Sequence, residues 1–459
     1  MKRVVVVGAG VAGLSAAHRI TELDPSVEVV VLEASTQPCG MLVSERTDDG
    51  FVIERGPDSI LTSKPAALAL AKRLGIEHRV VRTIEATRGA YVVHRGKLHR
   101  VPEGFNVVAP SDVWGLARSP ILSWRGKARA GLDLVLPKGP ARDDESLAHF
   151  VTRRFGPELL ERLAQPMAGG IYGAEPRRLS LRATMPRFLD VEQQSRSVTL
   201  GLMRQIKDGA AKASGARYGL FVSFDKGVAV LPETLAEKLG ERVRLQSAVH
   251  AIERVGPRWS VRTDDQTYVA DAVILAIPAR VAAPLLAPLD AELAAHLRAI
   301  RFGSAATATF AWRREDVPHP LDASGFVVPA IEGRLLLAGT WASAKWPGRA
   351  PEGKVLIRAF LGGNDRDECV RFDDGELLRE GLRGLSELMG ITAPPLFHRV
   401  DRYVNAMPRY EVGHLRRMDR VDALLARHGK LSLAGSSYRG VGIPDSIANA
   451  EAMAERALA

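Results

Sequence analysis

The sequence predicts a protein of mixed α/β and α+β class, with a discontinuous Rossmann-like dinucleotide-binding domain, a β-rich domain and a helical domain. Three observations predict this fold class. The chain opens with a strand, a glycine loop, a helix and a second strand; its middle third changes to helical segments punctuated by Pro and Arg; and its end carries a second glycine-rich turn followed by a helix. A chain of 459 residues also exceeds one typical domain.

The first elements form the opening unit of a nucleotide-binding sheet. Arg3–Val7 is an apolar, β-branched run and predicts a buried strand. A helix from Val11 to about Leu23 follows, and a second apolar strand, Val27–Leu32, ends at Glu33. Two such strands joined by a helix pair in parallel, so the opening is a βαβ unit.

The rest of the chain alternates between helical and strand-rich stretches. Segments within Leu147–Leu163 read as amphipathic helices, strand patterns return from about Arg217, and a β-rich block spans about Ala305–Phe360. The other elements that the pattern predicts are strands at Val243–Leu245, Trp259–Thr263, Ala272–Ile277 and Leu431–Gly435, and a helix from about Asp445 to Leu458.

These changes predict three domains. The dinucleotide-binding domain comprises residues 1–75, 213–285 and 405–459, so it is built from both ends of the chain and a central piece. Residues 76–100 and 286–404 form the β-rich substrate domain, and residues 101–212 form the helical domain.

The composition indicates a globular protein without a membrane-spanning helix or a Cys/His metal site. A chain that is 46% hydrophobic and 25% charged is an ordinary globular protein. Its two cysteines, Cys39 and Cys369, are expected to be free thiols in a reducing compartment. No stretch approaches the roughly 20 apolar residues of a spanning helix, no signal-peptide core is expected, and we find no Cys/His metal cluster. We therefore expect a cytoplasmic protein without a metal or a nucleic-acid partner.

The net charge of +10 is spread along the chain. It suits an acidic ligand or an anionic membrane surface, and a solvated Arg-rich surface explains it equally well. The segment Ala117–Leu136 interleaves basic and apolar residues and could lie on a membrane, although an exposed helix face accounts for it better.

The glycine loop Gly8-Ala9-Gly10-Val11-Ala12-Gly13 lies between a strand and a helix. At this place glycines permit a tight turn, close backbone approach to a pyrophosphate and close helix packing, and the helix N-terminus faces the phosphates. Glu33 follows the second strand, where its carboxylate can accept hydrogen bonds from a ribose and would disfavour NADP. A glycine turn with an incidental acid is the alternative interpretation.

The C-terminal turn helps to distinguish FAD from NAD as the cofactor. Gly435 to Ile447 forms a strand end, a glycine-rich turn and a helix start. Such a turn lets backbone amides reach a flat ring, and the helix dipole stabilises negative charge on a reduced flavin. A simple capped helix is the alternative.

Several segments resemble known flavoproteins. Glu33-Ala34-Ser35 through Gly40 resembles the E-A-x-x-R-x-G-G element of flavin amine oxidases, phytoene desaturases and porphyrinogen oxidases, with Gln37 and Cys39 departing from the pattern. Four further segments are similar to elements of the bacterial protoporphyrinogen and coproporphyrinogen oxidases. They are residues 50–59, 165–180, 405–414 and 442–445.

The resemblance, which extends from residue 4 to about residue 455, implies a porphyrinogen oxidase of the flavin amine oxidase superfamily. It implies FAD as cofactor and the same three-part fold, with a helical domain that touches the membrane in some members. The residues expected at the cofactor are Gly8, Gly10, Val11, Ala12, Gly13, Glu33, Ala34, Gly40, Gly56, Pro57, Asp58, Ser59, Val249, Gly435, Gly442, Ile443 and Pro444.

The substrate site is expected to use Arg88, Gly169, Gly170, Phe326 and Val328. Arg88 stands where the family places a propionate-binding arginine, and Gly169 and Gly170 would let backbone approach the macrocycle. A surface arginine, a helix-terminating turn and ordinary core packing of Phe326 and Val328 are the respective alternatives. His414 is interpreted as structural, and no protein side chain is assigned as catalytic because the flavin carries the chemistry.

The implied reaction is the six-electron oxidation of a porphyrinogen to the porphyrin in heme biosynthesis, in three flavin-dependent rounds, with oxygen as acceptor and hydrogen peroxide as product. The basic charge balance favours coproporphyrinogen III, which carries four propionates, over protoporphyrinogen IX. Contact with other heme-pathway enzymes and peripheral contact with the inner membrane face are the further partners considered. The alternatives are an amine oxidase, a carotenoid-type desaturase, or a flavin- or porphyrin-binding protein without turnover.

Overall fold

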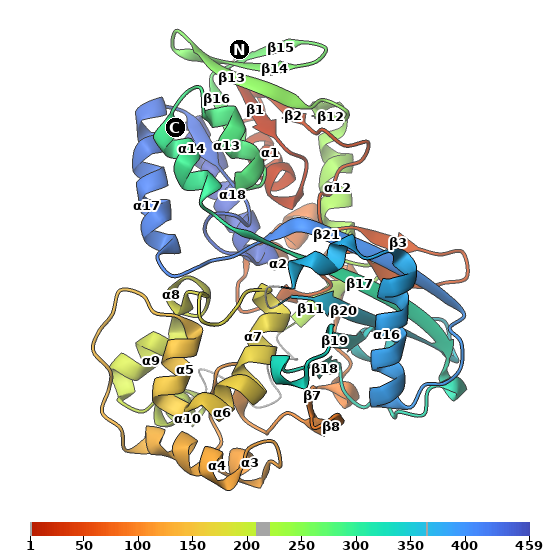
Figure 1. Ribbon diagram of the computed structural model, residues 1–459. Coiled ribbons are helices and arrows are strands. Elements are labelled where there is room, and N and C mark those ends of the chain that lie inside the picture. The colour runs from red at the N-terminus through yellow and green to blue at the C-terminus, as the bar shows by residue number, and fades with distance from the viewer. Residues whose placement is uncertain (1, 208–220, 364–365) are drawn as a thin grey trace.

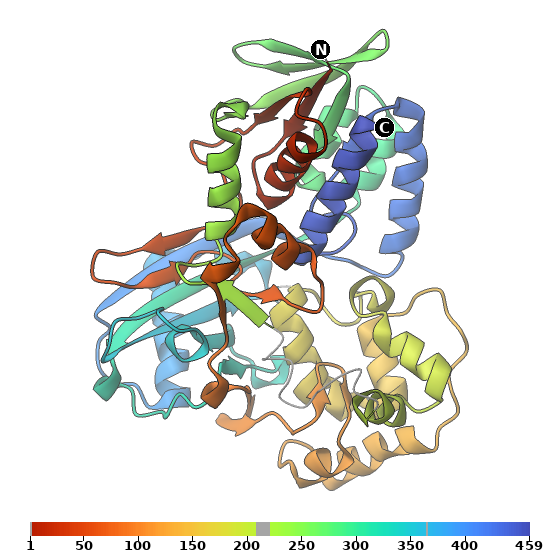
Figure 2. The ribbon, with the colours of Figure 1, turned by 180° about the vertical axis from the view of Figure 1, so that it is seen from behind.

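The computed structural model describes residues 2–207, 221–363 and 366–459. Three regions are visible: a parallel sheet between helices that contains both chain ends and, below it, a β-rich region and a helical region side by side (Figure 1; Figure 2). The predicted boundary at residues 212 and 213, and the strand pattern predicted from Arg217, lie outside the described residues. The fold class agrees with the prediction.

The nucleotide-binding region is organised around a five-stranded sheet in the order β12-β2-β1-β16-β22, in which every neighbouring pair is parallel. The strands are β1 (Arg3–Val7), β2 (Glu28–Leu32), β12 (Val243–Arg244), β16 (Ala272–Leu275) and β22 (Leu431–Leu433). The sheet therefore joins segments from the beginning, centre and end of the chain. Most residues of its strands are apolar and buried because both faces are covered.

Alternate residues of β1 enter two different cores. Val4 and Val6 pack with helices α1 (Val11–Leu23), α2 (Ala66–Leu74), α12 (Val230–Leu239) and α18 (Ile443–Leu458). Val5 and Val7 pack with α13 (Ala279–Leu286), α14 (Ala291–Arg298) and α17 (His414–Leu425), and with a small sheet of β13 (Val249–Val255), β14 (Arg258–Thr263) and β15 (Thr267–Ala270).

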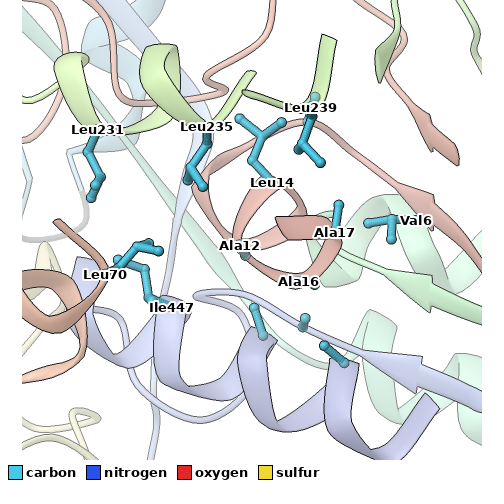
Figure 3. Close-up of a cluster of buried hydrophobic side chains, with 14 of the residues drawn as sticks. Val6, Ala12, Leu14, Ala16, Ala17, Leu70, Leu231, Leu235, Leu239 and Ile447 are labelled. Carbon is cyan, nitrogen blue, oxygen red and sulfur yellow. The ribbon is translucent and has the colours of Figure 1, made fainter. Parts of the chain in front are cut away.

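Helix α1, which follows the glycine loop, lies centrally in the first core (Figure 3). Ala12, Ala16 and Ala17 on α1, and Ala450 and Ala454 on α18, are small and buried. Small side chains let helices approach closely. Helix α1, which begins in the glycine loop, thus packs beside α18, the last helix of the chain.

A seven-stranded sheet forms the β-rich region, in the order β21-β17-β20-β19-β18-β7-β8. All neighbours are antiparallel except β18 and β7. The strands are β7 (Tyr91–His94), β8 (Lys97–Arg100), β17 (Phe302–Arg313), β18 (Gly325–Val327), β19 (Leu336–Trp341), β20 (Lys354–Gly362) and β21 (Phe397–Pro408). Helix α16 (Asp374–Met389) packs its apolar residues against this sheet.

The helical region has a core of its own. Its helices are α3 (Val113–Arg118), α4 (Trp124–Gly131), α5 (Leu147–Phe155), α6 (Pro157–Leu159), α7 (Gln165–Tyr172), α8 (Leu181–Thr184), α9 (Arg187–Ser195) and α10 (Val198–Lys207). The buried Arg154 guanidinium donates to Asp133 at 2.7 Å, which satisfies both charges inside the core. No helix within the described residues is long and apolar enough to span a membrane.

The predicted elements agree with the structure to within a few residues. Helix α18 begins at Ile443 rather than near Asp445, because Gly442 is its N-cap and Pro444 is tolerated in a first turn. The predicted helical stretch Leu147–Leu163 is divided, because Gly156 has a φ of 93° and ends α5. The domain limits proposed from the sequence remain predictions.

Candidate functional site

Two glycines of the loop after β1 are closely packed against neighbouring backbone, and the third, Gly10, has free space beside its Cα. A Cβ on Gly13 would lie 1.9 Å from the Gly8 carbonyl oxygen, and Gly8 has a φ of 101°. In contrast, a Cβ on Gly10 would meet nothing nearer than the Gly40 Cα, at 4.0 Å. Gly8 and Gly13 are therefore required for packing, and Gly10 leaves the backbone accessible.

Helix α1 begins on this loop without a cap. Gly10 is the N-cap residue, no side chain bonds to the first turn, and the first turn contains no acid. The amides of the first turn, which includes Val11 and Ala12, therefore keep their capacity to bind an anion, which the helix dipole favours.

Glu33 joins the two loops that follow β1 and β2. Its Oε2 accepts from the Ala9 N–H at 2.7 Å, and its Oε1 accepts from the Ser35 N–H at 2.9 Å. An ionised carboxylate has about four acceptor positions, so it can also accept from a ribose. Its backbone carbonyl accepts from Ser247, which brings the segment leading to Val249 beside it; Ala34 lies between Glu33 and Ser35.

The segment around Cys39 and Gly40 covers the glycine loop. The Cys39 N–H donates to the Ala9 carbonyl at 2.9 Å, and a Cβ on Gly40 would lie 3.1 Å from the Gly10 Cα. Cys39 has a φ of 90°, which a glycine would adopt without strain. Burial raises the pKa of Cys39 to about 12, so the thiol is neutral.

The C-terminal turn approaches the same crevice from the other chain end. Gly435 has a φ of 112°, and a Cβ there would lie 3.7 Å from the Ala12 Cβ. Gly442 is the N-cap residue of helix α18, and Ile443 and Pro444 are its first two residues. No side chain caps this helix either. The glycine loop and the C-terminal turn thus each present a helix N-terminus without a side-chain cap, and this arrangement suits a ligand with a diphosphate and a second electron-rich group.

Two ring side chains, Tyr410 and His414, anchor this turn. The Tyr410 hydroxyl donates to the Ser436 carbonyl at 2.8 Å and accepts from the Gly440 N–H at 2.8 Å. The His414 ring stacks on Tyr410 with centroids 3.8 Å apart, and its Nε2 donates to the Tyr438 carbonyl at 2.7 Å. Burial lowers the pKa of His414 to about 4. His414 is therefore neutral and supports the turn.

The loop formed by Glu54–Ser59 is held by the β-rich region. A Cβ on Gly56 would lie 2.0 Å from the Met41 carbonyl, so Gly56 and Pro57 follow a tightly packed path. Arg358 on β20 donates to the carbonyls of Glu54 and Gly56, both at 2.7 Å. These contacts fix the loop backbone.

Lys345, at the end of α15 (Ala342–Lys345), also holds the Glu54–Ser59 loop. Its Nζ lies 2.9 Å from the Asp58 carboxylate and 2.8 Å from the Ser59 hydroxyl. Although burial alone would raise the pKa of Asp58, the Lys345 ammonium and the Arg358 guanidinium outweigh it and hold that pKa well below its ordinary value. Lys345 and Arg358 were not predicted from the sequence, because neither lies in a segment with a recognisable motif.

Helix α7 forms one wall beside the β-rich sheet. Gly169 is buried within α7 and Gly170 is exposed, and a Cβ on Gly170 would lie 3.8 Å from a methyl group of Val327. Ile171 is 42% exposed. The helix continues past both glycines to Tyr172, and its C-cap is Gly173, so neither glycine terminates it.

The two predicted apolar lining residues point away from this wall. Phe326 and Val328 are buried in the core between the sheet and α16, where Phe326 contacts Trp341. Val327, between them, packs toward the helical region. Strand alternation explains the difference, because successive side chains leave opposite faces of a strand.

Arg88 precedes β7, the strand that pairs with β18. Its only ion pair within the described residues is with Glu85, at 2.9 Å, and the Glu85 side chain is 86% exposed. The Arg88 Nε is buried and has no hydrogen-bond partner in the part of the chain that the structure describes. The guanidinium can therefore accept a further anionic partner.

Most of the residues predicted from the sequence fall into two sets, and Phe326 and Val328 belong to neither because they lie in the core. The glycine loop, Glu33, Gly40 and the C-terminal turn come together around two helix N-termini, and Arg88, α7 and Val327 flank the β-rich sheet. The open backbone at Gly10 and the uncapped helices fit FAD. No cluster of His, Cys, Asp and Glu suited to a metal ion occurs among the residues that the structure describes.

Comparison with known proteins gives consistent matches. The family described as flavin containing amine oxidoreductase matches residues 11–458. Coproporphyrinogen III oxidase of Bacillus subtilis (strain 168) is 34% identical over 100% of this chain and 98% of its own length. Protoporphyrinogen oxidase 1, chloroplastic, of Arabidopsis thaliana is 28% identical over 96% of this chain and 84% of its own. A crystal structure from Exiguobacterium sp. 255-15, assigned as a protoporphyrinogen oxidase, superposes with a TM-score of 0.88 at 32% identity, covering 99% of this chain and 98% of that one.

Proposed function

The chain belongs to the family of flavin-containing amine oxidoreductases, and on that premise we propose that this FAD-dependent oxidase converts a porphyrinogen to the porphyrin in heme biosynthesis. The observation that carries the proposal is the end-to-end similarity, at 34% identity, to a coproporphyrinogen III oxidase. The two sets of site residues support it, because one suits FAD and the other offers an apolar wall beside a cation.

The overall reaction consumes three molecules of oxygen for each porphyrinogen. Aromatisation removes six electrons and six hydrogen atoms, and three oxygen molecules accept them to give three molecules of hydrogen peroxide. FAD, when bound, supplies an acceptor for two electrons at a time. The protein's task is to bind and orient the macrocycle, and three rounds require that the substrate be held or rebound between them.

Helix α7 and Val327 are the proposed contacts with the macrocycle. The absence of a side chain at Gly170 leaves the α7 backbone open, and Ile171 adds an apolar surface of the kind that a flat ring covers well. Phe326 and Val328 contribute through the packing that holds β18.

Arg88 is the proposed partner of a propionate. A guanidinium binds a carboxylate through two parallel hydrogen bonds, and the exposed Glu85 is a weak competitor. The net charge of +10 and the higher identity to the coproporphyrinogen III oxidase favour coproporphyrinogen III, the more acidic substrate, over protoporphyrinogen IX.

The test is turnover of both porphyrinogens by the purified FAD-loaded protein in air. We expect porphyrin fluorescence to appear with coproporphyrinogen III at a higher kcat/KM than with protoporphyrinogen IX, with three peroxides formed for each porphyrin. Peroxide from amines without porphyrin formation would favour an amine oxidase. Flavin that keeps its colour on anaerobic mixing with a porphyrinogen would indicate binding without turnover.

We also propose that the helical region contacts a membrane surface through α3 and α4. Trp114 is 71% exposed and Trp124 is 74% exposed, and Arg125 and Lys127 lie on the same short helix as Trp124. Exposed tryptophans beside cations suit the interface of an anionic bilayer. Arg129 is excluded from this surface, because its guanidinium donates to carbonyls at the end of α5.

A further inference from the structure

A broad hollow of about 710 Å³ lies at one edge of the five-stranded sheet, and none of its lining residues belongs to the site described above. Four cations and one carboxylate line it: Lys2, Arg254, Arg258, Lys430 and Asp271. Pro257 and Gly429 add backbone from the two adjoining turns. The charge of the hollow is therefore strongly positive.

The topology of the sheet separates this hollow from the FAD crevice. Lys2, Asp271 and Lys430 immediately precede β1, β16 and β22, three parallel strands that neighbour one another. Residues before parallel strands gather at the amino edge of the sheet, whereas the loops that bind the cofactor follow the carboxyl edge. A ligand in the hollow would therefore occupy a second, independent site.

The only carboxylate in the lining is already engaged. Asp271 accepts from the Arg3 N–H at 2.7 Å, and its other oxygen lies 3.2 Å from the Arg258 Nε. It therefore balances Arg258 and, together with Asp24, attracts Lys2 only weakly, because burial and Lys430 still lower the pKa of Lys2 overall.

The other three cations have no carboxylate partner within the described residues. Lys2 donates to the Leu458 carbonyl at 2.6 Å, and Arg254 donates to the carbonyls of Gly256 and His428, both at 3.0 Å. Burial and the neighbouring Lys430 ammonium lower the pKa of Lys2. Lys2 and Lys430 thus repel each other, and an anion placed between them would relieve the repulsion.

We propose that this cationic hollow binds a small polyphosphate, of the class of inorganic or nucleoside di- and triphosphates. A terminal phosphate concentrates a charge of about −1.5 to −2 on one compact group, which matches two adjacent ammonium groups better than a carboxylate does. Arg254, held in place by two carbonyls and by the Trp259 ring, presents a guanidinium suited to a second phosphate. The volume falls within the range of about 300–1,000 Å³ typical of small-ligand pockets.

Calorimetric titration of the full-length, FAD-loaded protein tests the proposal, with tripolyphosphate as the probe at physiological ionic strength. We expect one bound tripolyphosphate with a Kd below about 1 mM, and about tenfold weaker binding for Lys430→Gln and for Arg254→Gln, because each removes a charge-assisted hydrogen bond. Arg298→Gln is the matched control, because Arg298 is exposed and lies outside the hollow. Its affinity should equal that of the unmodified protein.

Three further measurements make the outcome decisive. The flavin absorbance must stay constant during the titration, because displacement of FAD would place the probe in the cofactor crevice and overturn the proposal. Equal binding of citrate would overturn the phosphate class, and binding of a glutamate-rich peptide without tripolyphosphate would assign the hollow to a protein partner instead. If Arg254→Gln fails to fold, Lys2→Gln replaces it; an unchanged Kd in both remaining variants would sink the idea.

Discussion

At the scale of single residues, His414 makes the turn above α18 sensitive to acid. The folded protein holds the pKa of His414 at about 4, against an ordinary value of 6.5, because the ring is buried. The unfolded chain therefore binds more protons between these two values, and stability falls as the pH is lowered through that window. At pH 5 the loss amounts to about 2 kcal/mol relative to pH 7.

Thermal unfolding of the FAD-loaded protein at pH 7 and pH 5 measures this effect. The His414→Gln variant should be less stable at pH 7 but should lose less stability on acidification than the unmodified protein. His250→Gln, at an exposed site, is the control and should leave the pH dependence unchanged. Parallel pH profiles for His414→Gln and the unmodified protein would contradict the assignment.

Arg88 offers a test of substrate binding. Arg88→Ala should raise KM for a porphyrinogen by about 10- to 100-fold, the equivalent of one charge-assisted pair, and leave FAD content unchanged. Arg82→Ala, an exposed arginine on the preceding strand, provides the control. An unchanged KM for Arg88→Ala would remove Arg88 from the site.

At the scale of elements, Gly170 should lower the stability of helix α7 but leave its surface open to the substrate. A Cβ at Gly170 makes only an ordinary contact at 3.8 Å, and glycine within a helix costs up to about 1 kcal/mol relative to alanine. Gly170→Ala should therefore raise the unfolding temperature slightly and lower kcat/KM, because the methyl group occupies the proposed macrocycle surface. Gly173→Ala should instead destabilise, since Gly173 has a φ of 57° and a Cβ there would lie 2.8 Å from Met407. Full activity in Gly170→Ala would place the substrate elsewhere.

The ion pair between Lys345 of α15 and Asp58 connects the β-rich region to the Glu54–Ser59 loop, whose residues 56–59 are expected at the cofactor. Lys345→Met removes an ammonium that pairs with Asp58 and should cost about 1.5–3 kcal/mol of stability and weaken FAD binding. Asp58→Asn should act similarly. Because the two residues share one interaction, the double variant should be less damaged than the sum of the single variants. Strict additivity, measured by thermal unfolding and FAD release, would show that the pair is not coupled.

At the scale of the whole molecule, the sequence predicted what depends on local pattern. The βαβ opening, the glycine loop and the C-terminal turn follow from period, glycine spacing and capping, so Arg3–Val7 and Val11–Leu23 have the predicted limits. Contacts between distant segments leave no such pattern. No motif near Lys345 or Arg358 indicates their bonds to residues 287 and 304 positions earlier. Selecting Val327 rather than Phe326 and Val328 would have required knowing which face of β18 meets α7.

The distribution of exposed tryptophan over the molecule carries the last prediction. Trp114 and Trp124 are the most exposed large apolar side chains among the described residues, and both lie in the helical region at the end remote from the nucleotide-binding sheet (Figure 1). If this end rests on a bilayer, the double variant Trp114→Ser/Trp124→Ser should sediment several-fold less with vesicles that contain anionic lipid, and the unmodified protein should lose binding as salt rises. Activity toward a porphyrinogen dissolved in detergent should stay unchanged, because neither tryptophan belongs to the proposed site. Equal sedimentation of the variant and the unmodified protein would show that the two tryptophans face water.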